Sequence, residues 1–197
     1  MPSPSAPLLR PHSILASSAS RGYPAAHTLD GSASTCWNSA ASSSGQWLEL
    51  TYERPVDAAR LAILFQGGFV GKDMCVWVRR AAASGAGGAA EGDGRDAAAC
   101  AERASRAEES SGTGAGTAGG SGAVAGDGVP SPHRGWEIAG TFEPDDSNSL
   151  QSFDLWPGVG VGVCGLRISF GRSTDFYGRV TVYTLEVMGA EGADVVG

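Results

Sequence analysis

Residues 46–52 read Gln-Trp-Leu-Glu-Leu-Thr-Tyr, and this stretch decides the fold class. Leu48, Leu50 and Tyr52 alternate with Glu49 and Thr51, so apolar side chains recur at every second position. Successive side chains of a β-strand point to opposite faces of the sheet. The alternation therefore predicts a strand with one face in a core and the other toward solvent.

Working outward from this stretch, further segments have the same short, apolar or alternating character. They are residues 60–65, 75–78, 136–142, 149–155, 164–170 and 180–188. Turn-forming Gly, Pro, Asp and Asn separate them, and no segment shows a long amphipathic helix. The sequence thus predicts an all-β protein, with a sandwich or a jelly roll as its architecture. If Trp47 belongs to its core, Trp47→Ala costs about 3–5 kcal/mol.

One change in composition organises the chain. Residues 81–134 contain no Phe, Tyr, Trp, Leu, Ile or Met and consist mainly of Ala, Gly, Ser and charged residues. Such a segment buries too little apolar area to offset its chain entropy. We expect a low-complexity loop at 81–134 that interrupts a sandwich domain of residues 13–189. Strands 75–78 and 136–142 should be neighbours, and residues 1–12 and 190–197 should be flexible ends.

Composition and charge exclude several functions. The chain has 197 residues with a net charge of −7, which argues against direct binding of nucleic acid. No stretch is apolar for long enough to cross a membrane, and Met1 to Arg10 lacks the apolar run of a secretory signal. Four cysteines are too few for a disulfide scaffold, so we expect an intracellular protein in which Cys36, Cys75 and Cys164 are small buried thiols.

Catalytic motifs are missing from the sequence. Its three histidines are His12, His27 and His133, and no His-x-x-x-His, Cys-x-x-Cys or Gly-x-Ser-x-Gly pattern occurs. The glycine-rich residues 158–162 lack the Lys-Ser/Thr of a phosphate loop. We therefore predict that the protein is not an enzyme and uses no cofactor.

Several stretches carry a resemblance to a known family. They include residues 27–31, 35–39 and 45–50, then 65–69, 144–153, 174–180 and 183–189. In this order they resemble discoidin (coagulation factor type C) domains of the galactose-binding-like superfamily, and in particular the nuclear receptor 2C2-associated protein family. The insertion at 81–134 departs from that family. Secreted discoidin domains usually join their two ends by a disulfide, which cannot form here because no cysteine lies near the last strand, and this supports an intracellular setting.

The resemblance implies a jelly-roll β-sandwich and a non-catalytic, intracellular role in protein association. Members of the family are described as binding an orphan nuclear receptor and repressing its transcriptional output. The expected partner is therefore a transcription factor or nuclear-receptor-like protein, and the expected location is the nucleus, the cytoplasm or both. The alternative is a module that binds a carbohydrate or another small ligand.

Related sandwiches hold ligands in the loops at one end, which here are residues 36–45, 66–73 and 171–179. Aromatic faces and hydrogen-bonding groups in these loops suit either a sugar or a protein partner. The candidate binding residues are Trp37, Asn38, Gln66, Phe69, Lys72, Asp175, Phe176, Tyr177 and Arg179. Alternatively, Trp37 and Phe176 plug the end of the sandwich, and Asp175 pairs with Arg179 to close a turn.

Asp30 is a weak candidate for a structural calcium site. In this superfamily the loop after the first strands often holds calcium, but residues 27–35 offer a single carboxylate, and calcium prefers six to eight oxygen ligands. The competing interpretation is a turn in which Asp30 accepts hydrogen bonds from neighbouring amides.

Overall fold

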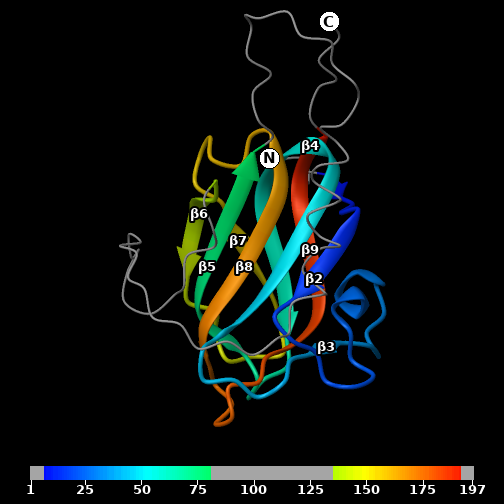
Figure 1. Ribbon diagram of the computed structural model, residues 1–197, viewed down its shortest axis with the longest axis vertical. Coiled ribbons are helices and arrows are strands. Elements are labelled where there is room, and N and C mark those ends of the chain that lie inside the picture. Colours follow the sequence, from blue (N-terminus) through cyan, green and yellow to red (C-terminus); the bar gives the residue numbers. More distant parts are fainter. Residues whose placement is uncertain (1–6, 81–134, 192–197) are drawn as a thin grey trace, which may run out of the picture.

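The described part of the chain, residues 7–80 and 135–191 of a computed structural model, forms nine β-strands and one short 3-10 helix (Figure 1). In chain order the elements are β1 (Leu8–Leu9), β2 (Ser13–Ala16), η1 (Ala25–Leu29), β3 (Trp37–Asn38), β4 (Gln46–Phe65), β5 (Gly71–Arg80), β6 (Glu137–Phe142), β7 (Leu150–Asp154), β8 (Val163–Ser173) and β9 (Thr181–Glu191). All strand pairs are antiparallel, which confirms the predicted all-β fold for the described residues. None of the described helices is long and apolar enough to cross a membrane.

Strand β4 joins the two layers of the sandwich. Residues 46–51 pair with β2 and β8, whereas residues 56–65 pair with β9, and residues 60–64 also with β7. The register with β8 shifts between Thr51 and Val56, where Pro55 offers no N–H to the ladder. In Figure 1 the first half of β4 rises in one layer, the strand bends at the upper end of the sandwich, and its second half descends in the other layer. The two stretches 46–52 and 60–65, predicted as separate strands, are therefore two halves of one bent strand.

The strands on either side of residues 81–134 are neighbours, as predicted. Strand β5 pairs with β6, with Met74 opposite Phe142 and Val78 opposite Glu137, and β8 pairs with the other edge of β5. After residues 81–134 the chain therefore continues as β6, directly beside β5. The predicted low-complexity loop itself lies outside the described residues, and so does Cys100.

The alternation in residues 46–52 places the core as expected. Leu48 and Leu50 are fully buried between the layers, and Tyr52 is nearly so. Trp47 lies on the opposite face of the strand and is only half-buried, so it is not a core residue. There the guanidinium of Arg167 lies 3.9 Å from the centre of the Trp47 ring and 3.2 Å from the Glu49 carboxylate.

The ordered chain begins earlier than the predicted boundary at residue 13. Leu8 and Leu9 pair with Met188 and Val187 of β9, and the Leu9 side chain is 3% exposed. A two-residue strand is too short to show a period, which is why the alternation did not reveal it. At the other end, β9 continues to Glu191.

The cysteines of the described chain behave as expected from the sequence. Cys36, Cys75 and Cys164 are buried thiols, and burial raises the pKa of Cys75 to about 11. They fill space as small apolar side chains do.

Candidate functional site

Three loops meet at the end of the sandwich that lies lowest in Figure 1, and hydrogen bonds hold them together. The Ser42 amide donates to the Tyr177 carbonyl (3.1 Å), and the Val180 amide donates to the Ser39 hydroxyl (2.9 Å). The Thr181 amide donates to the Phe69 carbonyl (3.0 Å). Loops 36–45, 66–73 and 171–179, predicted to converge, therefore form one connected surface.

The loop after β8 is pinned by a clasp between Asp175 and Arg179. The guanidinium of Arg179 donates to both carboxylate oxygens of Asp175, each at 2.9 Å. The amides of Tyr177 and Arg179 also donate to the Asp175 carboxylate, both at 3.1 Å. The bond from Arg179 is the main reason that the pKa of Asp175 falls from 3.8 to about 2. Asp175 and Arg179 therefore pair to close a turn, as the alternative interpretation held.

A close approach of the two loops fixes this turn further. Gly178 has φ +74°, and a Cβ at this position would lie 1.9 Å from the Ser42 carbonyl oxygen. Only glycine fits both the left-handed backbone and the contact. The loop is therefore held at its base by the Asp175–Arg179 clasp and by its packing against Ser42.

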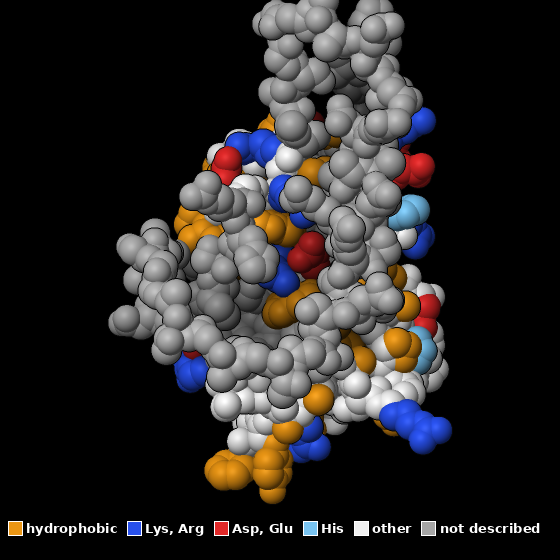
Figure 2. Space-filling view, viewed as in Figure 1, with side chains coloured by type: hydrophobic (Ala, Val, Ile, Leu, Met, Phe, Trp, Pro, Cys, Tyr) orange, Lys and Arg blue, Asp and Glu red, His pale blue; other side chains and the backbone are white. Residues whose placement is uncertain are grey.

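The clasp leaves two aromatic side chains at the tip of the loop. Phe176 is 94% exposed and Tyr177 is 63% exposed, and their rings meet edge to face with centroids 5.3 Å apart. Hydrophobic side chains project from this end of the molecule in Figure 2. The interpretation that Phe176 plugs the sandwich is wrong. We call Phe176 and Tyr177 the aromatic tip.

The clasp also joins Phe69 to the tip. The Arg179 guanidinium lies 5.1 Å from the Phe69 ring centre and 5.4 Å from the Tyr177 ring centre. Phe69 is half-buried and belongs to the second loop, residues 66–73. The structure thus brings together five of the nine candidates, namely Phe69, Asp175, Phe176, Tyr177 and Arg179.

Trp37 does not present its ring to a ligand. It is fully buried, and its Nε1 donates a 2.8 Å hydrogen bond to the Ser18 carbonyl. Trp37 pairs with Val182 of β9, which directs its indole between the layers. It plugs the sandwich, as the alternative interpretation held.

Asn38, Gln66 and Lys72 also have structural surroundings. Asn38 pairs with Thr181 of β9, and its Oδ1 is buried. Gln66 closes a turn through its backbone, because its carbonyl accepts from the Phe69 amide at 3.0 Å. The Lys72 ammonium forms a 2.9 Å ion pair with Glu143 and donates to the Pro144 carbonyl.

Sequence reasoning missed the serines beside the tip. A groove of about 280 Å³ runs between loops 42–46 and 171–178, and Ser42, Ser43 and Ser173 are among the residues that line it. The Ser173 hydroxyl donates to the Arg179 carbonyl and accepts from the Asp175 amide, and the Ser42 hydroxyl is hydrogen-bonded to Ser44. The sequence does contain a run of three serines at residues 42–44. The candidates were chosen among aromatic, charged and amide side chains, so they did not include these serines.

Asp30 forms the turn that the competing interpretation described. Its carboxylate accepts from the Ser32 amide at 2.8 Å and from the Thr35 hydroxyl at 2.7 Å. The bond from Thr35 is the main cause of the lowered pKa of Asp30. The loop supplies one carboxylate, and the described residues contain no group of three metal-binding side chains. This set does not fit a calcium site.

Comparison with solved structures defines the fold class. The chain is similar to the family 32 carbohydrate-binding module of Clostridium perfringens NanJ in complex with galactose, at 11% identity and a TM-score of 0.53, over 89% of this chain and 91% of that one. It is also similar to an F5/8 type C domain from Bacteroides fragilis, at 11% identity and a TM-score of 0.55, over 91% of each chain. The protein therefore has the galactose-binding-like, discoidin-type fold.

Comparison with curated proteins gives the particular resemblance. The chain is 29% identical to nuclear receptor 2C2-associated protein of Danio rerio over 161 residues, which cover 82% of this chain and 76% of that protein. It is 28% identical to the Homo sapiens protein over 163 residues, covering 83% and 78%. A 48-residue stretch is 52% identical to the Xenopus laevis protein, covering 24% and 33%. No model of a protein family matches the chain. The resemblance to the nuclear receptor 2C2-associated proteins is thus confirmed.

Proposed function

We propose that this protein is a non-catalytic interaction module whose aromatic tip docks into an apolar pocket on a protein partner. The observation that carries the proposal is the 94% exposure of Phe176 on a loop pinned at its base. A side chain that is 94% exposed buries little apolar area in the free protein, whereas buried aromatic anchors dominate the energetics of protein interfaces.

The polar groups around the tip favour a protein partner over a sugar. A sugar site needs hydrogen-bonding side chains that are free to converge on hydroxyl groups. Here both oxygens of Asp175 already accept from Arg179, and the Arg179 guanidinium also lies over aromatic rings. The tip therefore presents apolar surface on a loop that is already held rigid in the free protein. This preorganisation lowers the conformational entropy lost on docking.

The names of the relatives indicate the kind of partner. Proteins similar over most of this chain are called nuclear receptor 2C2-associated proteins, so we take a nuclear-receptor-like protein as the partner of the tip. A role in the nucleus, the cytoplasm or both follows from that partner. A non-catalytic role agrees with relatives named for association and with structural neighbours that are carbohydrate-binding modules or F5/8 type C domains.

A glycan is the second candidate ligand, and the groove beside the tip favours it. The groove has a volume of about 280 Å³ and is lined by Ser43 together with the exposed residues Phe176 and Tyr177. An exposed ring beside a concave surface can pack against the apolar face of a pyranose. Structural neighbours include the NanJ module in complex with galactose and a chitosan-binding module from Paenibacillus.

The test is a binding titration of purified nuclear receptor 2C2 with the full chain, with the mouse relative as positive control. We expect Phe176→Ala to weaken binding about 30-fold, the value for loss of a hot-spot contact of about 2 kcal/mol. Trp156→Ala is the matched control, because Trp156 is 46% exposed and lies outside the three loops. Equal affinities for wild type and Phe176→Ala would contradict docking through the tip.

The glycan alternative has its own measurement. Galactose and chitotriose are titrated into the isotope-labelled chain while amide chemical shifts are followed. Saturable shifts at Ser42, Ser43 and Ser173 would favour the groove as a sugar site. Unchanged spectra would leave the protein partner as the sole ligand class of this end.

A further inference from the structure

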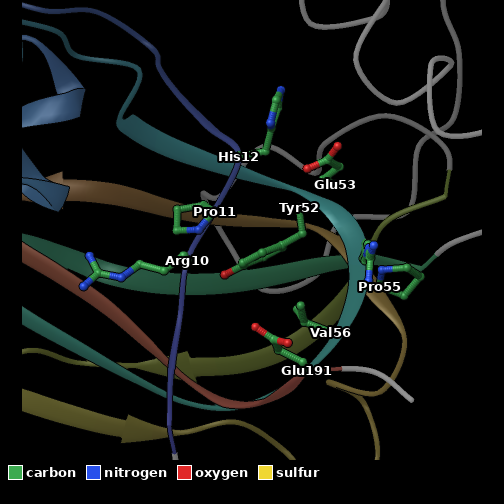
Figure 3. A pocket seen from close by; sticks show the side chains of 9 residues that line it. Arg10, Pro11, His12, Tyr52, Glu53, Pro55, Val56 and Glu191 are labelled. Atoms are coloured by element: carbon green, nitrogen blue, oxygen red, sulfur yellow. The ribbon is translucent and has the colours of Figure 1, made fainter. Parts of the chain in front are cut away.

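A second hollow lies at the opposite end of the sandwich, away from the aromatic tip. It has a volume of about 410 Å³ and forms where β4 bends and the chain crosses from β1 to β2. Figure 3 shows the side chains that surround it. They are Arg10, Pro11, His12, Tyr52, Glu53, Arg54, Pro55, Val56 and Glu191. This volume lies within the range of small-molecule sites.

The floor of the hollow holds a hydroxyl that lacks a partner. Tyr52 is 3% exposed, and its hydroxyl makes no hydrogen bond to any described residue. Burial raises the pKa of Tyr52, so the phenol stays protonated and able to donate. In Figure 3 the Tyr52 side chain lies among the side chains that surround the hollow, with its hydroxyl toward the side where Arg10 and Glu191 lie. A buried hydroxyl left unpaired is costly, and a ligand acceptor would relieve that cost.

The rim carries charges of both signs. Arg10, Glu53 and Glu191 are exposed, and within residues 7–80 and 135–191 their side chains form no ion pair or hydrogen bond. These opposite charges face one hollow without pairing with each other. A ligand that bears both charges can engage them together, whereas a simple anion or cation would meet a like charge on the rim.

We propose that this hollow binds a small zwitterion, an α-amino acid with an apolar side chain. Its carboxylate accepts hydrogen bonds from the Tyr52 hydroxyl and the Arg10 guanidinium. Its ammonium group donates to the Glu191 carboxylate. Its side chain contacts Pro11 and Pro55, which line the hollow together with the Tyr52 ring.

The first experiment tests whether both charges of the ligand are needed. L-Phenylalanine is titrated into the full chain by isothermal calorimetry, alongside 3-phenylpropionate, which lacks the ammonium group, and phenethylamine, which lacks the carboxylate. We expect L-phenylalanine to bind with a Kd of about 1 mM and each truncated probe to bind about tenfold more weakly. Equal binding of the three probes, or saturation by none, would overturn the proposal.

The second experiment separates a ligand role of Tyr52 from a structural one. Tyr52→Phe removes only the unpaired hydroxyl, so the melting temperature of the ligand-free protein should stay level or rise. Affinity for L-phenylalanine should fall about tenfold, as expected for loss of a hydrogen bond to a charged group. Tyr183→Phe, on half-buried Tyr183 of β9, and Glu186→Gln are the controls, and Glu191→Gln should weaken binding where Glu186→Gln does not. Unchanged affinity in Tyr52→Phe, or a fall in its melting temperature, would refute the assignment.

Discussion

Replacing the two tryptophans Trp37 and Trp47 by alanine should have very different effects on stability. Trp37 is fully buried and donates to the Ser18 carbonyl, so Trp37→Ala leaves a large cavity and an orphaned acceptor. We expect a loss of about 4 kcal/mol in the free energy of unfolding. Trp47 is half-buried and packs against Arg167, so Trp47→Ala should cost about 1 kcal/mol, mostly the cation–π contact.

Urea unfolding followed by circular dichroism measures both values. With a slope of about 2 kcal/mol per molar urea, a difference of about 3 kcal/mol separates the two midpoints by about 1.5 M. The slopes should be equal, because both variants expose the same chain on unfolding. Equal losses in the two variants would refute the assignment of Trp37 to the core and Trp47 to the outer face. A larger loss for Trp47→Ala would do so more strongly.

Other changes test the loops and the core. Gly178→Ala should lower stability by more than about 1 kcal/mol, because the new Cβ meets the Ser42 carbonyl at a positive φ; thermal melting measures it. The clasp should stabilise the fold fully above about pH 4 and lose this contribution as the pH falls through about 2, since folding lowers the pKa of Asp175 from 3.8 to about 2. The urea midpoints of wild type and Asp175→Asn should therefore approach each other as the pH falls and converge below about pH 2, and a constant gap would contradict the link to Arg179. Peptide mapping should find Cys75 unmodified by a thiol reagent in the folded protein and modified after unfolding, because burial raises its pKa to about 11.

The strands could be predicted from the sequence because one physical quantity, apolar burial at every second position, determines both pattern and fold. The alternation does not predict which side chains are buried where a strand is irregular. Val182 is buried and Tyr183 is half-buried because the register between β4 and β9 shifts near Phe65. Beyond this irregularity Leu185 and Val187 are buried in the expected alternation, so the pattern is inverted only at the start of β9, and no local pattern announces it.

The candidate site was predictable in place but not in detail. Loop positions follow from strand boundaries, whereas the convergence of 36–45, 66–73 and 171–179 at one end was implied by the resemblance to galactose-binding-like sandwiches. The role of an aromatic residue depends on which way its backbone faces, and that is set by pairing with a distant strand. Trp37 is buried because it pairs with Val182, whereas Phe176 lies at the tip of a turn, outside every strand pair of the described residues. Both are aromatic loop residues in the sequence, and tertiary structure alone separates them.

The two ends of the sandwich differ in which groups they expose, and the two ligands that we propose follow this difference. At the tip, Arg179 and two amides occupy the Asp175 carboxylate, and the exposed groups beyond it are the rings of Phe176 and Tyr177. At the hollow, the Tyr52 hydroxyl and the Glu191 carboxylate have no partner among the described residues. Apolar area on a projection requires a concave, apolar counterpart, which a macromolecule supplies. Unpaired polar groups around a concavity require a small polar molecule that fits inside. Binding at one end should therefore proceed without the other, so Phe176→Ala should leave the affinity for L-phenylalanine unchanged.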